Sequence, residues 1–117
     1  MGVHSYKELT VWQKAIALVK NIYGLTKNFP QNEQFGIVSQ MRRAAVSIPS
    51  NIAEGYGRKS PKEYKQFYSI AYGSALELDT QVLICRELGF INFTEHEKAD
   101  GILQEVIKML YVMTYKR

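Results

Sequence analysis

Residues 60–89 read SPKEYKQFYSIAYGSALELDTQVLICRELG, a stretch that predicts one long helix. Ser60 is a typical helix N-cap, Pro61 suits the first helical position, and Glu63 is placed to complete a capping box. Apolar residues recur at steps of three and four, which puts them on one helix face. They are Tyr64, Phe67, Tyr68, Ala71, Ala75, Leu78, Val82 and Cys85. We expect the helix to end at Gly89, because glycine is a common C-terminal cap.

The sequence on both sides of this stretch predicts three further helices. The first covers about residues 7–28 and closes before Pro30, since proline disfavours helical geometry in the residue before it. The second covers about residues 32–57, and the last covers about residues 94–115 with Thr94 as its N-cap. Four such helices with three short connections predict an all-α fold, an up-down-up-down antiparallel four-helix bundle.

The second of these helices contains Pro49 in its interior. Proline removes one amide donor and crowds the carbonyl of Ala45, so we expect a kink at Pro49 and not a break. Glycines at residues 55–57 then supply the C-terminal cap. The expected buried pattern of this helix is Phe35, Ile37, Val38, Met41, Ala45, Ile48 and Ile52.

The first and last helices carry more apolar residues than one core face requires. In the first helix the expected core stripe is Leu9, Trp12, Ile16, Val19 and Tyr23, with Leu18, Ile22 and Leu25 beside it. In the last helix Ala99, Leu103, Val106, Leu110 and Met113 form the expected core, with Ile102, Ile107, Tyr111 and Val112 beside it. The surplus suggests that the bundle buries a second surface against copies of itself, as a homo-oligomer.

Length and composition indicate a single domain over residues 1–117. A hydrophobic fraction of 46% with 22% charged residues argues against disorder. Cys85 is the only cysteine, which excludes an intrachain disulfide and favours a reducing cytoplasm. Residues 1–10 lack the continuous apolar segment of a signal peptide or membrane helix. We therefore expect a cytoplasmic protein that does not enter a membrane.

No motif for catalysis stands out, and we expect that the protein is not an enzyme. His4 and His96 have no patterned partner, although a base must lie within hydrogen-bond reach of its nucleophile. Cys85 falls on a core stripe, where a free cysteine behaves as a small buried hydrophobe. The Glu-x-x-His pairs of metal-binding bundles do not occur. We expect no metal, no cofactor and no small-molecule substrate.

The charge distribution favours anionic partners. Residues 1–65 hold 10 Lys and Arg against 4 Asp and Glu, whereas residues 66–117 hold 5 against 7. The basic candidates for phosphate contact are Arg42, Arg43, Arg58, Lys59, Lys62 and Lys65, with Tyr56, Tyr64 and Tyr68 interleaved. Basic residues neutralise phosphates and aromatic rings stack on unpaired bases, so this set suits RNA or single-stranded DNA.

The same residues also admit a structural reading. Glu77 lies among small and apolar residues, and buried charges are normally paired. In this alternative, Arg42 and Arg43 form internal ion pairs with Glu54 or Glu77, and the bundle is a structural or protein-interaction scaffold that binds no nucleic acid. The turn after residue 57 is likewise open to two interpretations, a plain helix cap or an anion-binding corner formed by Arg58 and Lys59.

Residues 41–58, MRRAAVSIPSNIAEGYGR, resemble the signature of a bacterial four-helix-bundle family. These are the proteins encoded in intervening sequences of large-subunit ribosomal RNA genes. Residues 6–15, YKELTVWQKA, and residues 75–81, ALELDTQ, are similarly typical of the family. The resemblance covers nearly the whole chain.

The resemblance implies an up-down four-helix bundle that assembles as a ring-like homopentamer. The accessory proteins of diversity-generating retroelements are similar too, and in that group a basic pentamer binds nucleic acid and a reverse transcriptase. Carried over to this chain, Arg42, Arg43, Arg58 and Lys59 would be the anion contacts.

Overall fold

The computed structural model describes residues 5–116, which form four α-helices, two short 3-10 helices and no strand. The 3-10 helices are Tyr6–Glu8 and Gln31–Glu33. The α-helices are α1 (Thr10–Thr26), α2 (Ile37–Tyr56), α3 (Pro61–Glu87) and α4 (Phe93–Tyr115). The predicted all-α four-helix fold is confirmed.

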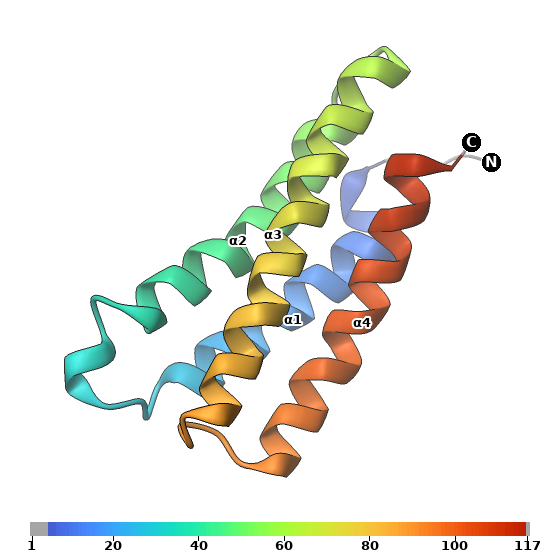
Figure 1. The fold of residues 1–117 in the computed structure, drawn as a ribbon. Helices are drawn as coiled ribbons and strands as arrows, with labels where there is room; N and C mark the ends of the chain where they lie inside the picture. Colours follow the sequence, from blue (N-terminus) through green and yellow to red (C-terminus); the bar gives the residue numbers. More distant parts are fainter. Residues whose placement is uncertain (1–4, 117) are drawn as a thin grey trace.

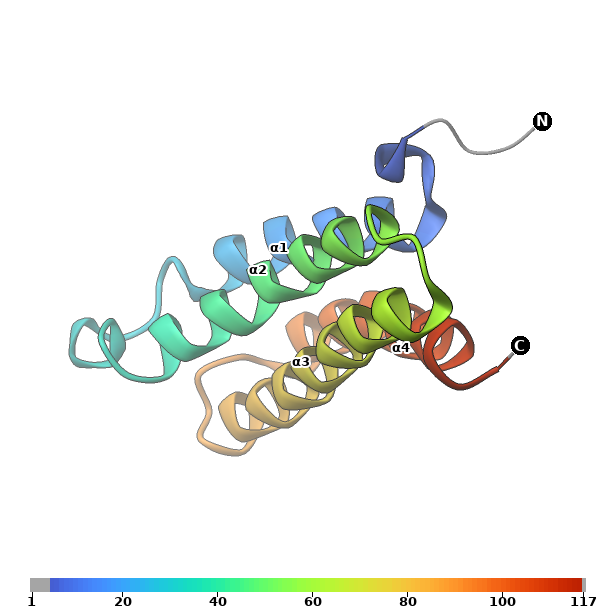
Figure 2. The ribbon, with the colours of Figure 1, turned by 90° about the horizontal axis from the view of Figure 1, so that it is seen from above.

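Successive helices run in opposite directions, and each packs mainly against two neighbours (Figures 1 and 2). α2 packs on α1 and α3, and α4 closes the bundle between α3 and α1. The bundle measures 45 × 25 × 22 Å. As a result, the α2–α3 turn, the start of α1 and the end of α4 lie at one end of the molecule (Figure 1).

One hydrophobic cluster contains side chains from all four helices. Burial of a large aliphatic side chain contributes about 1.5–3 kcal/mol, so this cluster is the main source of stability. Its largest fully buried members are Leu18 and Ile22 from α1, Val38, Met41, Ile48 and Ile52 from α2, Leu78 and Val82 from α3, and Leu103, Val106 and Leu110 from α4.

The predicted core stripe of the first helix is wrong. α1 buries Val11, Ala15, Leu18, Ile22 and Thr26, whereas the predicted stripe is only partly buried and its last member, Tyr23, is exposed. Both stripes have helical periodicity, and periodicity alone does not say which one faces the core. Three members of the expected stripe, Trp12, Ile16 and Val19, instead line an open groove between α1 and α2.

α2 continues through Pro49 without interruption, so the predicted absence of a break is confirmed. A bend at this residue stays a prediction. The helix begins at Ile37, five residues later than expected, after a separate 3-10 turn. Phe35 lies in this turn region with its side chain 98% exposed, so its predicted place in the core is wrong.

The predicted glycine cap of α2 is confirmed at Gly57, whereas Gly55 has a different role. Gly57 is the C-cap, but its φ of −78° is right-handed and open to any residue. Gly55 lies inside the helix and is buried against α3. A Cβ at this position would lie 2.6 Å from Cε1 of Tyr68 and 3.1 Å from the carbonyl oxygen of Tyr64. Gly55 therefore allows α2 and α3 to approach closely at their connected ends.

The predicted cap residues of α3 are confirmed, although only one of the two hydrogen bonds of the expected capping box is present. The Ser60 hydroxyl accepts a hydrogen bond from the amide of Glu63 at 3.2 Å, and Pro61 is the first helical residue. At the other end, Gly89 has a φ of +79°, a conformation that glycine adopts without steric cost.

The predicted cap of the last helix is wrong by two residues. Asn92, not Thr94, is the N-cap of α4, and it forms a complete capping box with Glu95. The amide of Glu95 donates to the Asn92 side chain at 2.8 Å, and the amide of Asn92 donates to the Glu95 carboxylate at 2.9 Å. A capping box can begin with asparagine or with threonine, provided that glutamate follows three residues later. The chain contains two such pairs, Asn92 with Glu95 and Thr94 with Glu97, and they overlap in sequence.

Candidate nucleic-acid interface

Four of the predicted basic residues gather where α2 turns into α3. α2 ends at Tyr56 and Ser60 caps α3, so the turn is short. Arg58 and Lys59 lie in the turn itself, and Lys62 and Lys65 lie on the first turns of α3. We call these four residues, Arg58, Lys59, Lys62 and Lys65, the basic corner.

Arg58 is held against both helices of the corner. Its guanidinium forms an ion pair with Glu54 at 2.8 Å, one helical turn earlier on α2. The same guanidinium lies over the ring of Phe67 on α3, 4.7 Å from the ring centroid. Both ion-pair partners are largely exposed, so the pair orients Arg58 more than it stabilises the fold.

The three lysines of the basic corner are less constrained. Lys59 and Lys62 are exposed and form no ion pair with any carboxylate of residues 5–116. Lys65 is partly buried, and its ammonium donates to the carbonyl oxygen of Lys116 at 3.5 Å, across to the end of α4. The acidic residues nearest in sequence are Glu54, which Arg58 neutralises, and Glu63. The corner therefore keeps a net positive charge.

Arg42 and Arg43 do not belong to this corner. They lie near the start of α2, about 20 Å from its end at 1.5 Å per residue. The predicted grouping of all six basic residues between the second and third helices is therefore wrong. A sequence separation of 14 helical residues already implies this distance.

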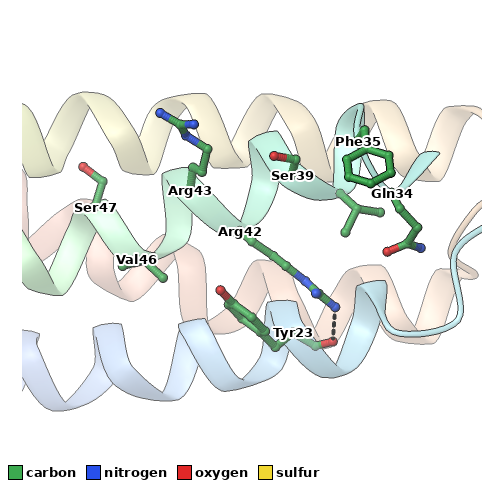
Figure 3. A pocket seen from close by; sticks show the side chains of 9 residues that line it. Tyr23, Gln34, Phe35, Ser39, Arg42, Arg43, Val46 and Ser47 are labelled. Atoms are coloured by element: carbon green, nitrogen blue, oxygen red, sulfur yellow. Dashed lines mark hydrogen bonds between the residues drawn. The ribbon is translucent and has the colours of Figure 1, made fainter. Parts of the chain in front are cut away.

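Arg42 binds α1. Its Nε donates to Oγ1 of Thr26 at 3.0 Å, and a terminal nitrogen donates to the carbonyl oxygen of Tyr23 at 3.3 Å (Figure 3). The guanidinium also lies 4.5 Å from the centroid of the Tyr23 ring. Thr26 in turn donates to the carbonyl oxygen of Ile22 at 2.7 Å. These contacts give Arg42 a structural role at the end of α1.

The predicted internal ion pairs are wrong. Arg43 is exposed, extends to the side of α2 away from Tyr23 (Figure 3), and pairs with no carboxylate of the described residues. Glu54 pairs with Arg58 instead. Glu77 is exposed and accepts a hydrogen bond from Gln81 at 3.3 Å. Its apolar neighbours in sequence lie on other faces of α3, so Glu77 keeps its hydration and needs no arginine.

An open groove with a volume of about 620 Å³ runs along α2 beside Arg42 (Figure 3). Its lining includes the exposed residues Tyr23, Phe35 and Val46. A second groove, of about 350 Å³, lies between α1 and α2 and shares Val46 with the first. It is lined by Tyr6, Trp12, Ile16, Val19, Val46, Pro49, Ser50 and Ala53. Together they form a mostly apolar face, here called the α1–α2 face.

Cys85 and His96, the two described residues considered for catalysis, contact different partners. Cys85 is fully buried, 3.4 Å from the sulfur of Met41. Burial, with a smaller contribution from Glu33, raises the pKa of the Cys85 thiol to about 11. His96 lies at the far end of the bundle, 3.3 Å from a guanidinium nitrogen of Arg86, and His4 lies outside the described residues. No group of three or more metal-ligating side chains occurs within residues 5–116.

No helix in the described part of the chain is both long and apolar enough to cross a membrane.

Comparison with known proteins places this bundle in a family. The model of the 23S rRNA-intervening sequence protein family matches residues 7–112. The chain belongs to this family. No curated protein sequence matches it significantly.

A crystal structure at 1.70 Å of a protein from Bacteroides thetaiotaomicron has the same fold. That protein is described as a member of the S23 ribosomal protein family with unknown function. The two chains are 21% identical, with a TM-score of 0.81 over 91% of this chain and 99% of the other.

Proposed function

We propose that the chain is a cytoplasmic, non-enzymatic, homo-oligomeric bundle that binds RNA or single-stranded DNA through its basic corner. The observation that carries the proposal is the position of Lys59 and Lys62. Both ammonium groups are exposed beside a third lysine and an oriented arginine, and neither is neutralised by a carboxylate of the described residues. Such groups release counterions when they meet phosphates, and this release drives nucleic-acid binding.

Arg42 and Arg43 have lesser parts in this proposal. Arg42 already binds α1 through three contacts, so its charge is less available to a ligand. Arg43 is exposed but lies near the start of α2, away from the basic corner. The family's association with intervening sequences of 23S rRNA is consistent with an RNA ligand.

Salt-dependent binding of a fluorescent single-stranded RNA tests the basic corner. We expect Lys59→Gln/Lys62→Gln to weaken binding and to reduce the slope of log K against log salt by about 1.4, or about 0.7 per lost phosphate contact. Lys27→Gln/Lys98→Gln removes the same charge from two exposed positions toward the opposite end of the bundle, the C-cap of α1 and the start of α4. This control should change the slope much less. Equal slopes for the two variants would contradict the assignment of the corner.

The α1–α2 face carries the proposed self-association. Phe35 is 98% exposed and lies beside an apolar groove, and such side chains on a small protein indicate a contact surface. In a pentamer, light scattering would give five times the chain mass of 13.4 kDa. We expect Phe35→Ser to lower the measured mass without a loss of helicity, since this side chain contributes little to the core. A wild-type protein with the mass of one chain would exclude the oligomer.

The competing hypothesis is a scaffold that binds no nucleic acid. An oligomer with no affinity for RNA at low salt would support this alternative and contradict the proposed ligand.

A further inference from the structure

A second surface lies next to the basic corner, where the start of α3 packs on the end of α4. Residues 64–76 and residues 106–116 contain no Asp or Glu, and they carry Lys65, Lys108 and Lys116. These two stretches are therefore free of carboxylates, and the carboxylates that border them are Glu63 and Glu77 on α3 and Glu105 on α4. An anionic polymer meets no repulsion from the two stretches themselves.

Three tyrosines from the two helices form a continuous ring cluster on this surface. The rings of Tyr111 and Tyr115 lie 5.2 Å apart by their centroids, one turn apart on α4. Tyr72 from α3 contacts both, at 6.0 Å and 5.7 Å. Tyr111 is 45% exposed and Tyr115 is 58% exposed, so each has ring surface open to solvent. We call these three residues the tyrosine cluster.

A groove of about 600 Å³ lies between the start of α3 and the end of α4 and includes Lys65 of the basic corner. Its α4 residues Val112 and Lys116 directly follow Tyr111 and Tyr115 of the tyrosine cluster in sequence. Lys65 and Lys116 lie on opposite walls of the groove and are joined by their hydrogen bond. Tyr64 and Tyr68 add a further pair of rings, 5.7 Å apart, along the α3 wall. Lys65 and Lys116 therefore supply positive charge between the basic corner and the exposed rings of Tyr111 and Tyr115.

We infer that the tyrosine cluster stacks with unpaired bases and makes the protein select single-stranded over double-stranded nucleic acid. This inference rests on the proposed function. Stacking needs bases whose faces are accessible, and the faces of paired bases in a duplex are covered by their neighbours. Phosphate contacts at the basic corner do not distinguish the two forms in this way, because both present a charged backbone. Selectivity for single strands then comes from Tyr111 and Tyr115.

The test compares a fluorescent oligouridine RNA with a blunt duplex RNA of equal length. We expect Tyr111→Leu/Tyr115→Leu to weaken binding of the single strand by about tenfold or more, because two stacking rings are lost. Duplex binding should change less than about twofold, and the salt slope of the single strand should stay the same, since no phosphate contact is removed. Tyr111→Phe/Tyr115→Phe keeps both rings and should bind the single strand nearly as the wild type does.

The outcomes separate this inference from the proposed function. If Lys59→Gln/Lys62→Gln weakens RNA binding but the leucine variant binds oligouridine as the wild type does, the stacking surface is wrong and the basic corner stands. If the wild-type protein binds neither the single strand nor the duplex, the stacking inference and the proposed function are both wrong. A leucine variant with a smaller mass in light scattering would show that the tyrosines contact a second copy, which overturns the inference. Circular dichroism confirms that each variant remains helical.

Discussion

The ring of Tyr68 on α3 covers Gly55 on α2 so closely that no other residue fits there without movement. Both residues are buried, and the contact also includes the backbone of α3 at Tyr64. Because backbone cannot move aside as a flexible side chain does, this contact fixes the distance between the two helices next to the basic corner.

We expect Gly55→Ala to destabilise the protein by about 1–3 kcal/mol, the usual cost of overpacking a tight core. Gly73→Ala is the matched control, since Gly73 is also helical but has open space around its Cβ position. Its free energy of unfolding should rise by about 0.5–1 kcal/mol, because alanine favours helix over glycine. Urea unfolding measures both changes. An equally stable Gly55→Ala protein would show that α2 and α3 can separate here at no cost.

Arg42 and Arg43 should differ in their effect on stability. Arg42→Ala removes two hydrogen bonds and a ring contact with α1, and we expect a loss of about 1–2 kcal/mol. Arg43→Ala removes an exposed side chain with no ion pair to the described residues, so its effect should stay within about 0.5 kcal/mol. Thermal unfolding of the two variants tests this order. A larger loss of stability for Arg43→Ala than for Arg42→Ala would support the predicted internal ion pair of Arg43.

Asn92 and Thr94 are adjacent candidates for the cap of α4, and substitution distinguishes them. Asn92→Ala removes the side-chain oxygen that accepts from the Glu95 amide and should cost about 0.5–2 kcal/mol. Thr94→Ala lies within the first turn and should change stability by less than about 0.5 kcal/mol. Chemical denaturation of the two single variants gives the comparison. A larger loss at Thr94 would place the start of α4 two residues later.

The buried thiol of Cys85 should make stability depend on pH in the alkaline range. Its pKa is about 11 in the folded chain and 9.0 for an ordinary thiol, so the folded state holds the proton more tightly. The stability that this proton gives is complete below pH 9 and is lost as pH rises through about 11. The difference corresponds to about 2–3 kcal/mol, and the raised pKa of Tyr68 acts in the same direction.

Unfolding free energies measured below pH 9 and at about pH 11 test this dependence. Cys85→Ala lowers stability at both values through its small cavity but should reduce the decline between them. A decline of the same size in the variant and the wild type would assign the alkaline loss to other groups.

The sequence predicts the number, order and approximate bounds of the helices because proline, glycine and cap residues mark the ends of each one. The start of α3 is the clearest case, since Ser60 and Pro61 satisfy separate requirements of a helix N-terminus. Where two candidate caps overlap in sequence, as Asn92 and Thr94 do, both satisfy the sequence requirement for a helix N-cap. Only the folded structure shows which of them is the cap.

The core face of α1 is less predictable. α1 carries two adjacent stripes that are similarly apolar. The buried stripe includes Val11, Leu18 and Ile22, and the competing stripe includes Trp12, Ile16 and Val19. Which stripe is buried depends on how α2 and α4 close over the helix, and this is a property of the whole bundle. The same dependence explains why Phe35, apolar but located before α2, ends outside the core.

The candidate site is predictable in part. The basic corner follows from the spacing of Arg58, Lys59 and Lys62 around a helix start. The binding of Arg42 to Thr26 and Tyr23 does not, since it joins side chains that only the packing of α1 on α2 brings together. The approach of Tyr72 to Tyr111 likewise depends on the register of α3 against α4.

The position of the chain ends has a practical consequence for anyone who attaches a tag or fluorophore. Tyr6 contacts Tyr56 with ring centroids 6.5 Å apart, and Lys116 receives the hydrogen bond of Lys65, so both ends of the described chain lie beside the basic corner. An affinity tag at either end, particularly one rich in histidine or lysine, would add its own charge to the surface being assayed. The α3–α4 turn, at the opposite end of the bundle, is the better attachment site, and exposed Leu88 suits it better than Gly89, whose positive φ favours glycine.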